Sequence, residues 1–519
     1  MKKKLLKTIW ITGLIIFITG AAIAQPNIEW QKTYGGNEND FCWGIYPTTD
    51  GGYVLTGSTD SSANGDISGM NNGATDIWVV KIDDNGNIDW EKNFGGSNND
   101  TAWSILQTTD GGYIVAGSSS SNDGDVSGNI GGNDFWILKL DANGIIDWEK
   151  SYGGSGTEQA RSIQQTTDGG YIVAGTTSSN DGDVGGNNGG QDIWIVKLDT
   201  NGNIDWEKNY GGTSSDQARS IQQTTDGGYI VAGYTISNDG DVGGNYGESD
   251  IWIVKLFSNG NLDWEQNYGG SGDDKANSIQ QTNDGGYIIA GESYSTNGDV
   301  GGNNGTRDYW ILKINMTGTI EWDKNYGGFG HEYSYDIKQT SDNGYIVTGV
   351  SHSSGSGDVG GNNGGGDFWI LKLDSNGNLD WEQNYGGNSH DNPYRIHQTQ
   401  DGGYIIAGST ESTDLPGGNQ GGLDFWLVKF EANNLSIDDV SSFKSLVIYP
   451  NPSKDIITLD HLTINSTIII KDNLGKEIFR TITNSEKAIV STSAFSNGVY
   501  VIQIKSNGNT INKKLIVNK

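Results

Sequence analysis

One short register recurs seven times along this chain of 519 residues, and it limits the possible folds more than any other feature. Each copy contains Tyr-Gly-Gly, then Asp-Gly-Gly-Tyr or a close variant, then Asp-x-Trp. The copies begin every 58 to 60 residues, at Tyr34, Phe94, Tyr152, Tyr210, Tyr268, Tyr326 and Tyr385. Self-similarity at this period, built from strand-like pieces, indicates a repeat architecture whose units bury their apolar faces against their neighbours.

Each copy is expected to form four short β-strands. In the third copy they are predicted at residues 162–166, 171–176, 192–198 and 203–208, where β-branched and aromatic residues alternate with polar ones. Asn201-Gly202, between the last two strands, favours a hairpin because both residues accept the positive φ of a tight turn. No window carries a helical period longer than about two turns, so the predicted class is all-β.

The two ends of the array predict how it closes. A strand of the fourth type at residues 28–32 precedes the first complete copy, whereas the last copy stops at its third strand, residues 424–430. A ring closed by pairing its two ends leaves no unpaired strand edge. The sequence therefore predicts a seven-bladed β-propeller over residues 25–430, with four-stranded blades and an N-terminal strand that closes the ring.

Residues 1–24 have the features of a secretory signal peptide. Four lysines precede an apolar stretch at residues 9–22, and Ala22-Ile23-Ala24 is a small-x-small cleavage site. This stretch is too short for an integral membrane span, and no other segment is apolar enough. The chain has a formal net charge of −32, which disfavours nucleic acid as a partner and suits cations or neutral polymers.

Beyond a polar linker at residues 431–445, residues 446–519 read as a separate small β-sandwich. It opens with Tyr-Pro-Asn-Pro, continues with a Gly-x-Tyr strand and ends in a basic and apolar tail. The residues that carry these motifs are Pro450, Asn451, Pro452, Gly498, Tyr500 and Lys514. The segment resembles the type A C-terminal sorting domain of the type IX secretion system of Bacteroidetes. That resemblance implies export through the periplasm, the type IX machinery as a partner, and a final place on the outer-membrane surface or outside the cell.

The repeat region also resembles the bacterial SBBP-type β-propeller repeats. The matching elements, taken from the third copy, are Tyr152-Gly153-Gly154, residues 171–175 and residues 192–198. The resemblance spans most of the repeat array and implies the propeller fold. It implies no activity, because function belongs to sites that are grafted on folds.

The long loop between the second and third strands of each copy is rich in Asp, Asn and Gly. One aspartate recurs in the same place of this loop, at Asp125, Asp183, Asp241, Asp299 and Asp358. Calcium takes six to eight oxygen ligands from such side chains and from backbone carbonyls, so these residues are candidate calcium ligands. The alternative is that Asp and Asn form Asx turns while Gly allows the bends.

Two tryptophans in each copy are regular enough to indicate packing between blades, but Trp43 and Trp103 fall outside this pattern. They are therefore the better candidates for contact with a ligand such as a sugar, which stacks on flat aromatic faces. Two histidines, His331 and His390, share one register near the end of the array and could meet between adjacent blades. The alternative is that these histidines are solvated residues on the rim.

These features favour an exported, non-catalytic binding or adhesion module, with a glycan or protein as its ligand and calcium as its one candidate cofactor. A hydrolase or lyase that acts on polysaccharides is the first alternative, although no nucleophile elbow, zinc motif or phosphate loop is present. An inert scaffold of a surface layer is the second.

Overall fold

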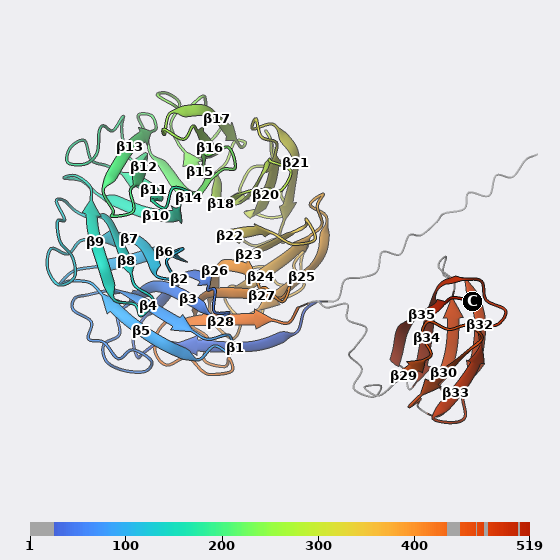
Figure 1. Cartoon of the computed structure of the whole chain (residues 1–519). Helices are drawn as coiled ribbons and strands as arrows, with labels where there is room; N and C mark the ends of the chain where they lie inside the picture. The colour runs from blue at the N-terminus through green and yellow to red at the C-terminus, as the bar shows by residue number, and fades with distance from the viewer. Residues whose placement is uncertain (1–24, 433–446, 463, 465, 472–475, 507–508) are drawn as a thin grey trace, which may run out of the picture. The chain divides into compact units, whose positions relative to one another are not determined.

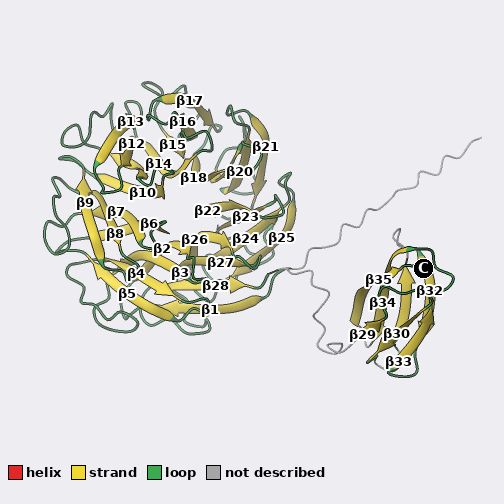
Figure 2. Cartoon of the chain, in the orientation of Figure 1, coloured by secondary structure: helices red, strands yellow, loops and turns green. Residues whose placement is uncertain are grey.

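A computed structural model describes residues 25–432, 447–462, 464, 466–471, 476–506 and 509–519. The predicted signal peptide, residues 1–24, and most of the predicted linker, residues 431–445, lie outside the described residues. The chain divides into two compact units between residues 433 and 434. All regular structure among the described residues is β-strand, as Figure 2 shows.

The first unit is a ring of seven four-stranded antiparallel sheets (Figure 1). The strands of each sheet are given from the inside of the ring outward. The first sheet is β2 (Asp40–Pro47), β3 (Tyr53–Thr59), β4 (Asp76–Ile82) and β5 (Ile88–Phe94), and the second is β6 (Asp100–Gln107), β7 (Tyr113–Ser119), β8 (Asp134–Leu140) and β9 (Ile146–Tyr152). The third is β10 (Glu158–Gln165), β11 (Tyr171–Thr177), β12 (Asp192–Leu198) and β13 (Ile204–Tyr210). The fourth is β14 (Asp216–Gln223), β15 (Tyr229–Thr235), β16 (Asp250–Leu256) and β17 (Leu262–Tyr268), and the fifth is β18 (Asp274–Gln281), β19 (Tyr287–Ser293), β20 (Asp308–Ile314) and β21 (Ile320–Tyr326). The sixth is β22 (Glu332–Gln339), β23 (Tyr345–Ser351), β24 (Asp367–Leu373) and β25 (Leu379–Tyr385). The seventh is β26 (Asp391–Gln398), β27 (Tyr404–Thr410), β28 (Asp424–Phe430) and β1 (Ile28–Tyr34).

The seventh sheet joins the two ends of the array. Strand β1 pairs antiparallel with β28, from Ile28 opposite Phe430 to Tyr34 opposite Phe425. The first and seventh blades also share one hydrophobic cluster, in which Trp78 packs against Phe425 with ring centroids 4.7 Å apart. The all-β propeller class and the place of the N-terminal strand are as predicted.

The third strand of every blade is buried on both faces because a neighbouring blade covers each side. All seven residues of β12 are buried, and Trp194 has no exposed surface. Its ring packs against Phe135 of the preceding blade at a centroid distance of 4.6 Å, and its Nε1 donates to Glu207 of β13 at 3.0 Å. The strand-three tryptophans therefore form the contact between blades.

Hydrogen bonds from a repeated tyrosine hydroxyl to a turn carbonyl of the next blade tie adjacent blades together. The Tyr152 hydroxyl donates to the carbonyl of Gly202, which lies in the β12–β13 turn of the next blade. Gly202 has a φ of +77°, and a Cβ there would lie 2.9 Å from the ring of Trp148. The Asn-Gly turn is therefore required both by its own backbone conformation and by the approach of the neighbouring blade.

The innermost strands differ from the prediction at one end. Strand β10 begins at Glu158, four residues before the predicted start, and its pairing with β11 shifts between Ala160 and Ser162. Arg161 occupies this β-bulge, which breaks the alternation that marks a strand in the sequence. The same shift occurs on the innermost strand of every blade.

The second unit is a β-sandwich, as predicted. Its sheets are β29 (Val447–Tyr449), β30 (Ile456–Asp460) and β33 (Lys487–Ser491); and β32 (Glu477–Ile482), β31 (Thr467–Lys471), β34 (Gly498–Ser506) and β35 (Asn509–Val517). Residues of both sheets, such as Leu459 and Ile502, form one core. The Tyr-Pro-Asn-Pro segment is fixed to β35, because Asn451 donates to the carbonyl of Lys514 and accepts from the N–H of Ile516, both at 2.8 Å.

We predict that Trp194→Ala lowers the free energy of unfolding of the first unit by about 3–5 kcal/mol, because it removes a fully buried indole from the contact between blades. Trp206→Ala, on the outer strand β13, is the matched control and should cost about 1–3 kcal/mol because that ring is only partly buried. Urea denaturation followed by circular dichroism measures both. Equal losses would mean that strand three does not dominate the packing.

A candidate binding pocket in the central channel

The repeated aspartates of the long loops bind the backbone that joins their blade to the preceding one. The N–H of Asp183 donates to the carbonyl of Gly153 at 2.8 Å, and its Oδ2 accepts from the N–H of the same glycine at 3.2 Å. Asp125, Asp241, Asp299 and Asp358 make the same pair of bonds to Gly95, Gly211, Gly269 and Gly327. The candidate calcium ligands thus hydrogen-bond a long loop to the Tyr-Gly-Gly segment.

Two further carboxylates flank the same glycine. A Cβ on Gly153 would lie 2.5 Å from Asp134 Oδ1 and 2.6 Å from Glu158 Oε2. Burial, and then the charges of Glu158 and Asp183, raise the pKa of Asp134 to about 6. Asp134 Oδ1 is buried without a hydrogen-bond partner among the described residues. Corresponding carboxylates surround the glycine at each of the other six junctions between blades.

No group of three or more His, Cys, Asp or Glu side chains in the described part of the chain is arranged to hold a metal ion. The carboxylates around Gly153 share the space close to one backbone segment, but their geometry is that of hydrogen-bond acceptors. As the residues stand, the acidic junctions stabilise loops and form no preformed metal centre.

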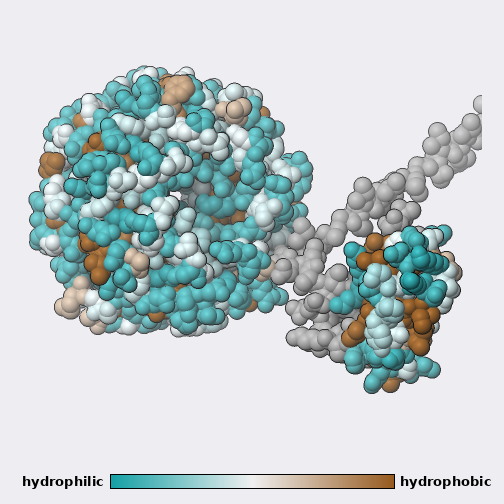
Figure 3. Space-filling view, in the orientation of Figure 1, coloured by the Kyte–Doolittle hydropathy of each residue, from teal (hydrophilic) through white to brown (hydrophobic). Residues whose placement is uncertain are grey.

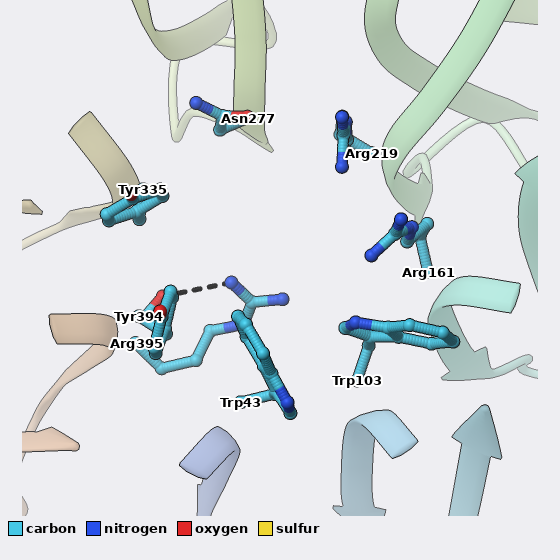
Figure 4. A pocket seen from close by; sticks show the side chains of 8 residues that line it. All are labelled: Trp43, Trp103, Arg161, Arg219, Asn277, Tyr335, Tyr394 and Arg395. Carbon is cyan, nitrogen blue, oxygen red and sulfur yellow. Dashed lines mark hydrogen bonds between the residues drawn. The ribbon is translucent and has the colours of Figure 1, made fainter. Parts of the chain in front are cut away.

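A different set of residues, which the seven-fold pattern does not repeat, meets at the centre of the ring. One side chain from the bulge of each innermost strand lines a pocket of about 110 Å³. The seven bulge residues are Trp43, Trp103, Arg161, Arg219, Asn277, Tyr335 and Tyr394, and the neighbouring Arg395 completes the lining. We call them the channel pocket (Figure 4). The seven bulge positions hold four residue types, namely Trp, Arg, Asn and Tyr.

Aromatic rings and guanidinium groups contact one another in the channel pocket. The Cζ of Arg161 lies 4.3 Å from the centre of the Trp103 ring. Across the pocket, Trp43 packs against Tyr394 at a centroid distance of 4.4 Å, and Arg395 donates from Nη1 to the carbonyl of Tyr394 at 2.9 Å. Figure 4 shows Arg395 reaching in from one side while Arg161 and Arg219 lie on the other.

Among the described residues, no ion pair joins the three arginines of the pocket to a carboxylate, although the charge of Arg219 acts on Glu292 and that of Arg395 acts on Asp336. The chain has five arginines, and the ion pairs that arginine forms among the described residues are Arg307 with Glu292 and Arg480 with Glu477. Burial and the charge of Arg219 lower the pKa of Arg161 to about 9, so Arg161 stays charged at neutral pH. A cationic pocket therefore lies at the centre of a strongly acidic protein.

A wider pocket of about 370 Å³ continues along the channel and shares Arg219, Asn277 and Arg395 with the first. Serines and glutamines of the second to fifth blades contribute uncharged polar side chains to its lining. The sixth and seventh blades replace them with Asp336, Lys338 and His397. Asp336 is bound by Lys338 at 2.8 Å and by the N–H of Ile396 at 3.1 Å, and His397 Nε2 lies 3.0 Å from the carbonyl of Ile45.

The four predicted ligand-contact residues fall into two places. Trp43 and Trp103 line the channel pocket, whereas His331 and His390 are exposed and line neither pocket. The histidines are joined by His352, whose Nδ1 lies 3.1 Å from the carbonyl of His331 and whose ring is 6.0 Å from that of His390. The structure thus brings the pair into one surface group but does not connect it to the channel.

Sequence reasoning missed Arg161, Arg219, Arg395, Tyr335 and Tyr394. A signal was present, because the ninth residue after the opening aromatic of each copy gives Trp43, Trp103, Arg161, Arg219, Asn277, Tyr335 and Tyr394. Reading that position across all copies, and not only for tryptophan, identifies every bulge residue of the pocket.

The surface around the channel is mostly hydrophilic on the face seen in Figure 3. In the second unit the same view shows hydrophobic residues at the surface, and Ile482 and Ile489 are each 67% exposed. The described residues contain no helix long and apolar enough to cross a membrane.

Residues 447–518 match the family model of the secretion system C-terminal sorting domain. The predicted sorting domain is therefore confirmed, and the protein is handled by the type IX machinery and exported to the cell surface or the extracellular space. No curated protein matches the chain in sequence.

Several solved propeller structures are similar to the chain. PorZ of Porphyromonas gingivalis, a surface component of its type IX secretion system, is 13% identical over 94% of this chain and 60% of PorZ, with a TM-score of 0.41. A puromycin hydrolase is 10% identical over 82% of this chain and 59% of its own, with a TM-score of 0.44. A DUF4221 protein of Bacteroides vulgatus is 9% identical over 78% and 98%, with a TM-score of 0.33. The chain spans less than two thirds of PorZ, and likenesses at these scores carry no argument about function.

We predict that the first unit is most stable in mildly acidic solution. Burial raises the pKa of Asp192 and its equivalents to about 6, so these groups bind protons more tightly in the folded state, and the stability they give is lost as the pH rises through 6. A hydrogen bond from Thr166 and the ion pair with Lys197 outweigh the effect of burial and lower the pKa of Asp168 to about 2. The stability that the charged Asp168 gives to the folded state is therefore lost only when the pH falls below its unfolded pKa of 3.8. In a buffer with chelator, the melting temperature should be higher at pH 5 than at pH 7.5.

Asp192→Asn is the matched variant for this prediction. It removes the charge but keeps an oxygen for the N–H of Asn188, which donates to Asp192 at 2.7 Å. The melting temperature should rise at pH 7.5 and change little at pH 4.5. A wild-type protein that melts at its highest temperature at pH 7.5 would contradict the assignment.

Proposed function

We propose that residues 25–430 form a non-catalytic binding module that acts outside the cell and takes its ligand in the channel pocket. In this proposal residues 1–24 are a signal peptide and residues 431–445 link the module to the sorting domain, residues 446–519. The observation that carries the proposal is the loss of seven-fold symmetry at the bulge position, where Trp43, Trp103 and the arginines replace any single repeated residue. A purely structural position in a repeat has no reason to diverge in this way.

The chemistry of the pockets favours binding over catalysis. Guanidinium groups do not exchange protons near neutral pH, so the arginines bind and orient but are poor acids or bases. Asp336 is the one carboxylate that lines either pocket in the described chain, and Lys338 and backbone N–H groups already engage it. Hydrolysis of a glycosidic bond needs two carboxyl groups at a fixed separation. The hydrolase or lyase alternative therefore has less support, and an inert scaffold would not need the pocket.

The binding proposal is tested on glycan and extracellular-matrix arrays with the purified protein. We expect Trp43→Ala and Trp103→Ala to reduce binding of any hit by roughly tenfold or more, the usual effect of removing an aromatic residue at the centre of a site. Trp264→Ala, on the outer strand β17, is the matched control and should leave binding unchanged.

A hit that survives both pocket substitutions would move the site to another surface, such as the group of His331, His352 and His390. No hit on either array, with the variants folded as judged by circular dichroism, would favour the scaffold alternative.

Calcium is a second proposal, and it rests on the unpartnered oxygen of Asp134 beside Glu158 and Asp183. A divalent cation would relieve the repulsion among these carboxylates. Calcium should then raise the melting temperature at pH 7.5, chelator should reverse the rise, and Asp183→Ala should reduce it. Asp323→Ala, which removes a carboxylate on the outer strand β21, serves as the control. An unchanged melting temperature with and without calcium would reduce Asp125, Asp183, Asp241, Asp299 and Asp358 to loop fasteners.

A further inference from the structure

The charged groups of the channel pocket are all hydrogen-bond donors. Its three guanidinium groups are joined by the indole Nε1 of Trp43, which is buried without a hydrogen-bond partner among the described residues. The Asn277 amide instead donates within the protein, to Glu292 at 2.6 Å and to the carbonyl of Ser334 at 2.9 Å. The Nε of Arg219 is also buried without a hydrogen-bond partner among the described residues. A set of fixed donors with few acceptors selects a ligand that is rich in acceptor oxygens.

The charges that face the pocket leave a positive excess. The three arginines line the channel pocket itself, whereas Lys338 and Asp336 lie in the wider pocket and form an ion pair there, with Asp336 also accepting from Ser278 and the N–H of Ile396. Glu292, beside the pocket, accepts from Asn277 at 2.6 Å, and burial raises its pKa to about 7. Its negative charge is therefore incomplete at neutral pH, and His397 is neutral because burial lowers its pKa to about 4.

The wider pocket continues the donor pattern in uncharged form. The side-chain oxygens of Gln164, Gln222 and Gln280 accept from backbone N–H groups of the next blade at 2.5–2.6 Å. Their Nε2 groups make no hydrogen bond within the described residues and line the channel with donors. Four serines, Ser104, Ser162, Ser220 and Ser278, lie in the same wall.

We infer that the channel binds an acidic saccharide, with a carboxylate or sulfate group held between Arg161, Arg219 and Arg395. Guanidinium forks match such oxyanions in shape as well as charge. The rings of Trp43, Tyr335 and Tyr394 offer half-buried faces for a sugar ring, and the glutamine amides of the wider pocket can donate to its hydroxyl oxygens. The inference rests on the proposed binding function and names its ligand class.

Isothermal titration calorimetry in low salt tests this inference on the full exported chain. The two acidic probes are trigalacturonate and a chondroitin sulfate tetrasaccharide, and the matched neutral probe is trigalacturonate with its carboxylates methyl-esterified. We expect at least one acidic probe to bind and the neutral ester to bind more weakly by roughly tenfold or more, because it cannot form charge-assisted hydrogen bonds. Binding should also weaken as salt is added.

Variants identify the site. Arg161→Gln and Arg395→Gln should each weaken the acidic probe by roughly tenfold or more, since each removes a charged donor. Arg161→Lys keeps the charge but loses the fork and should fall between wild type and Arg161→Gln. Arg480→Gln is the matched control, because it makes the same change on an exposed arginine of the second unit and should have no effect.

The outcomes separate this inference from the proposed function. Equal affinity for acidic and neutral probes, or affinity that Arg161→Gln and Arg395→Gln leave unchanged, would overturn the acidic class while the binding role stands. No detectable binding of either acidic probe would also overturn the acidic class of ligand. Sulfate ion alone that displaces trigalacturonate at equal affinity would reduce the site to a simple oxyanion site and overturn the saccharide. A bound acidic probe with no array hits would uphold the inference and reject adhesion.

Discussion

The contact between neighbouring blades is the interaction on which the rest of this structure depends. No blade can bury its own third strand, because both faces of that strand are apolar and each needs a neighbouring sheet. Trp194 meets Phe135 of the preceding blade, and the same arrangement continues to Trp78 and Phe425 where the array closes. A seven-copy array that satisfies every such contact must return to its start. The channel, with its pocket, is the space left when it does.

The repeated and the non-repeated residues have different duties. Positions that recur in all copies, such as the loop aspartates and the turn glycines, make bonds within the ring and leave little for a ligand. The bulge positions differ from blade to blade, and their side chains line the channel pocket, where Trp43 contacts Tyr394 and Arg161 contacts Trp103. Symmetry in this chain therefore marks what holds the ring together, and under the proposed function its loss marks the channel pocket as the place where a ligand binds.

The fold was almost entirely predictable because each strand and turn carries its own local pattern, seven times over. The site was predictable only in part. Trp43 and Trp103 stand out as tryptophans outside the register, but Arg161 and Arg219 look like ordinary polar residues of a strand. Their meaning depends on which side chains from separate blades face one another, which sequence distance hides. The charge of the pocket could not be read from the net charge for the same reason, since −32 is a property of the whole chain and the pocket collects three of its five arginines.

The pairing of β1 with β28 also orders events in time. The strand that leaves the ribosome first has no partner until residue 430 has been made, so the ring cannot be completed during most of synthesis. The sorting domain follows directly in the sequence, at residues 447–518. A chain that displays this address has therefore already been translated through every strand of its ring, and truncated products lack the label for delivery. The order of the two units works as a check on completeness.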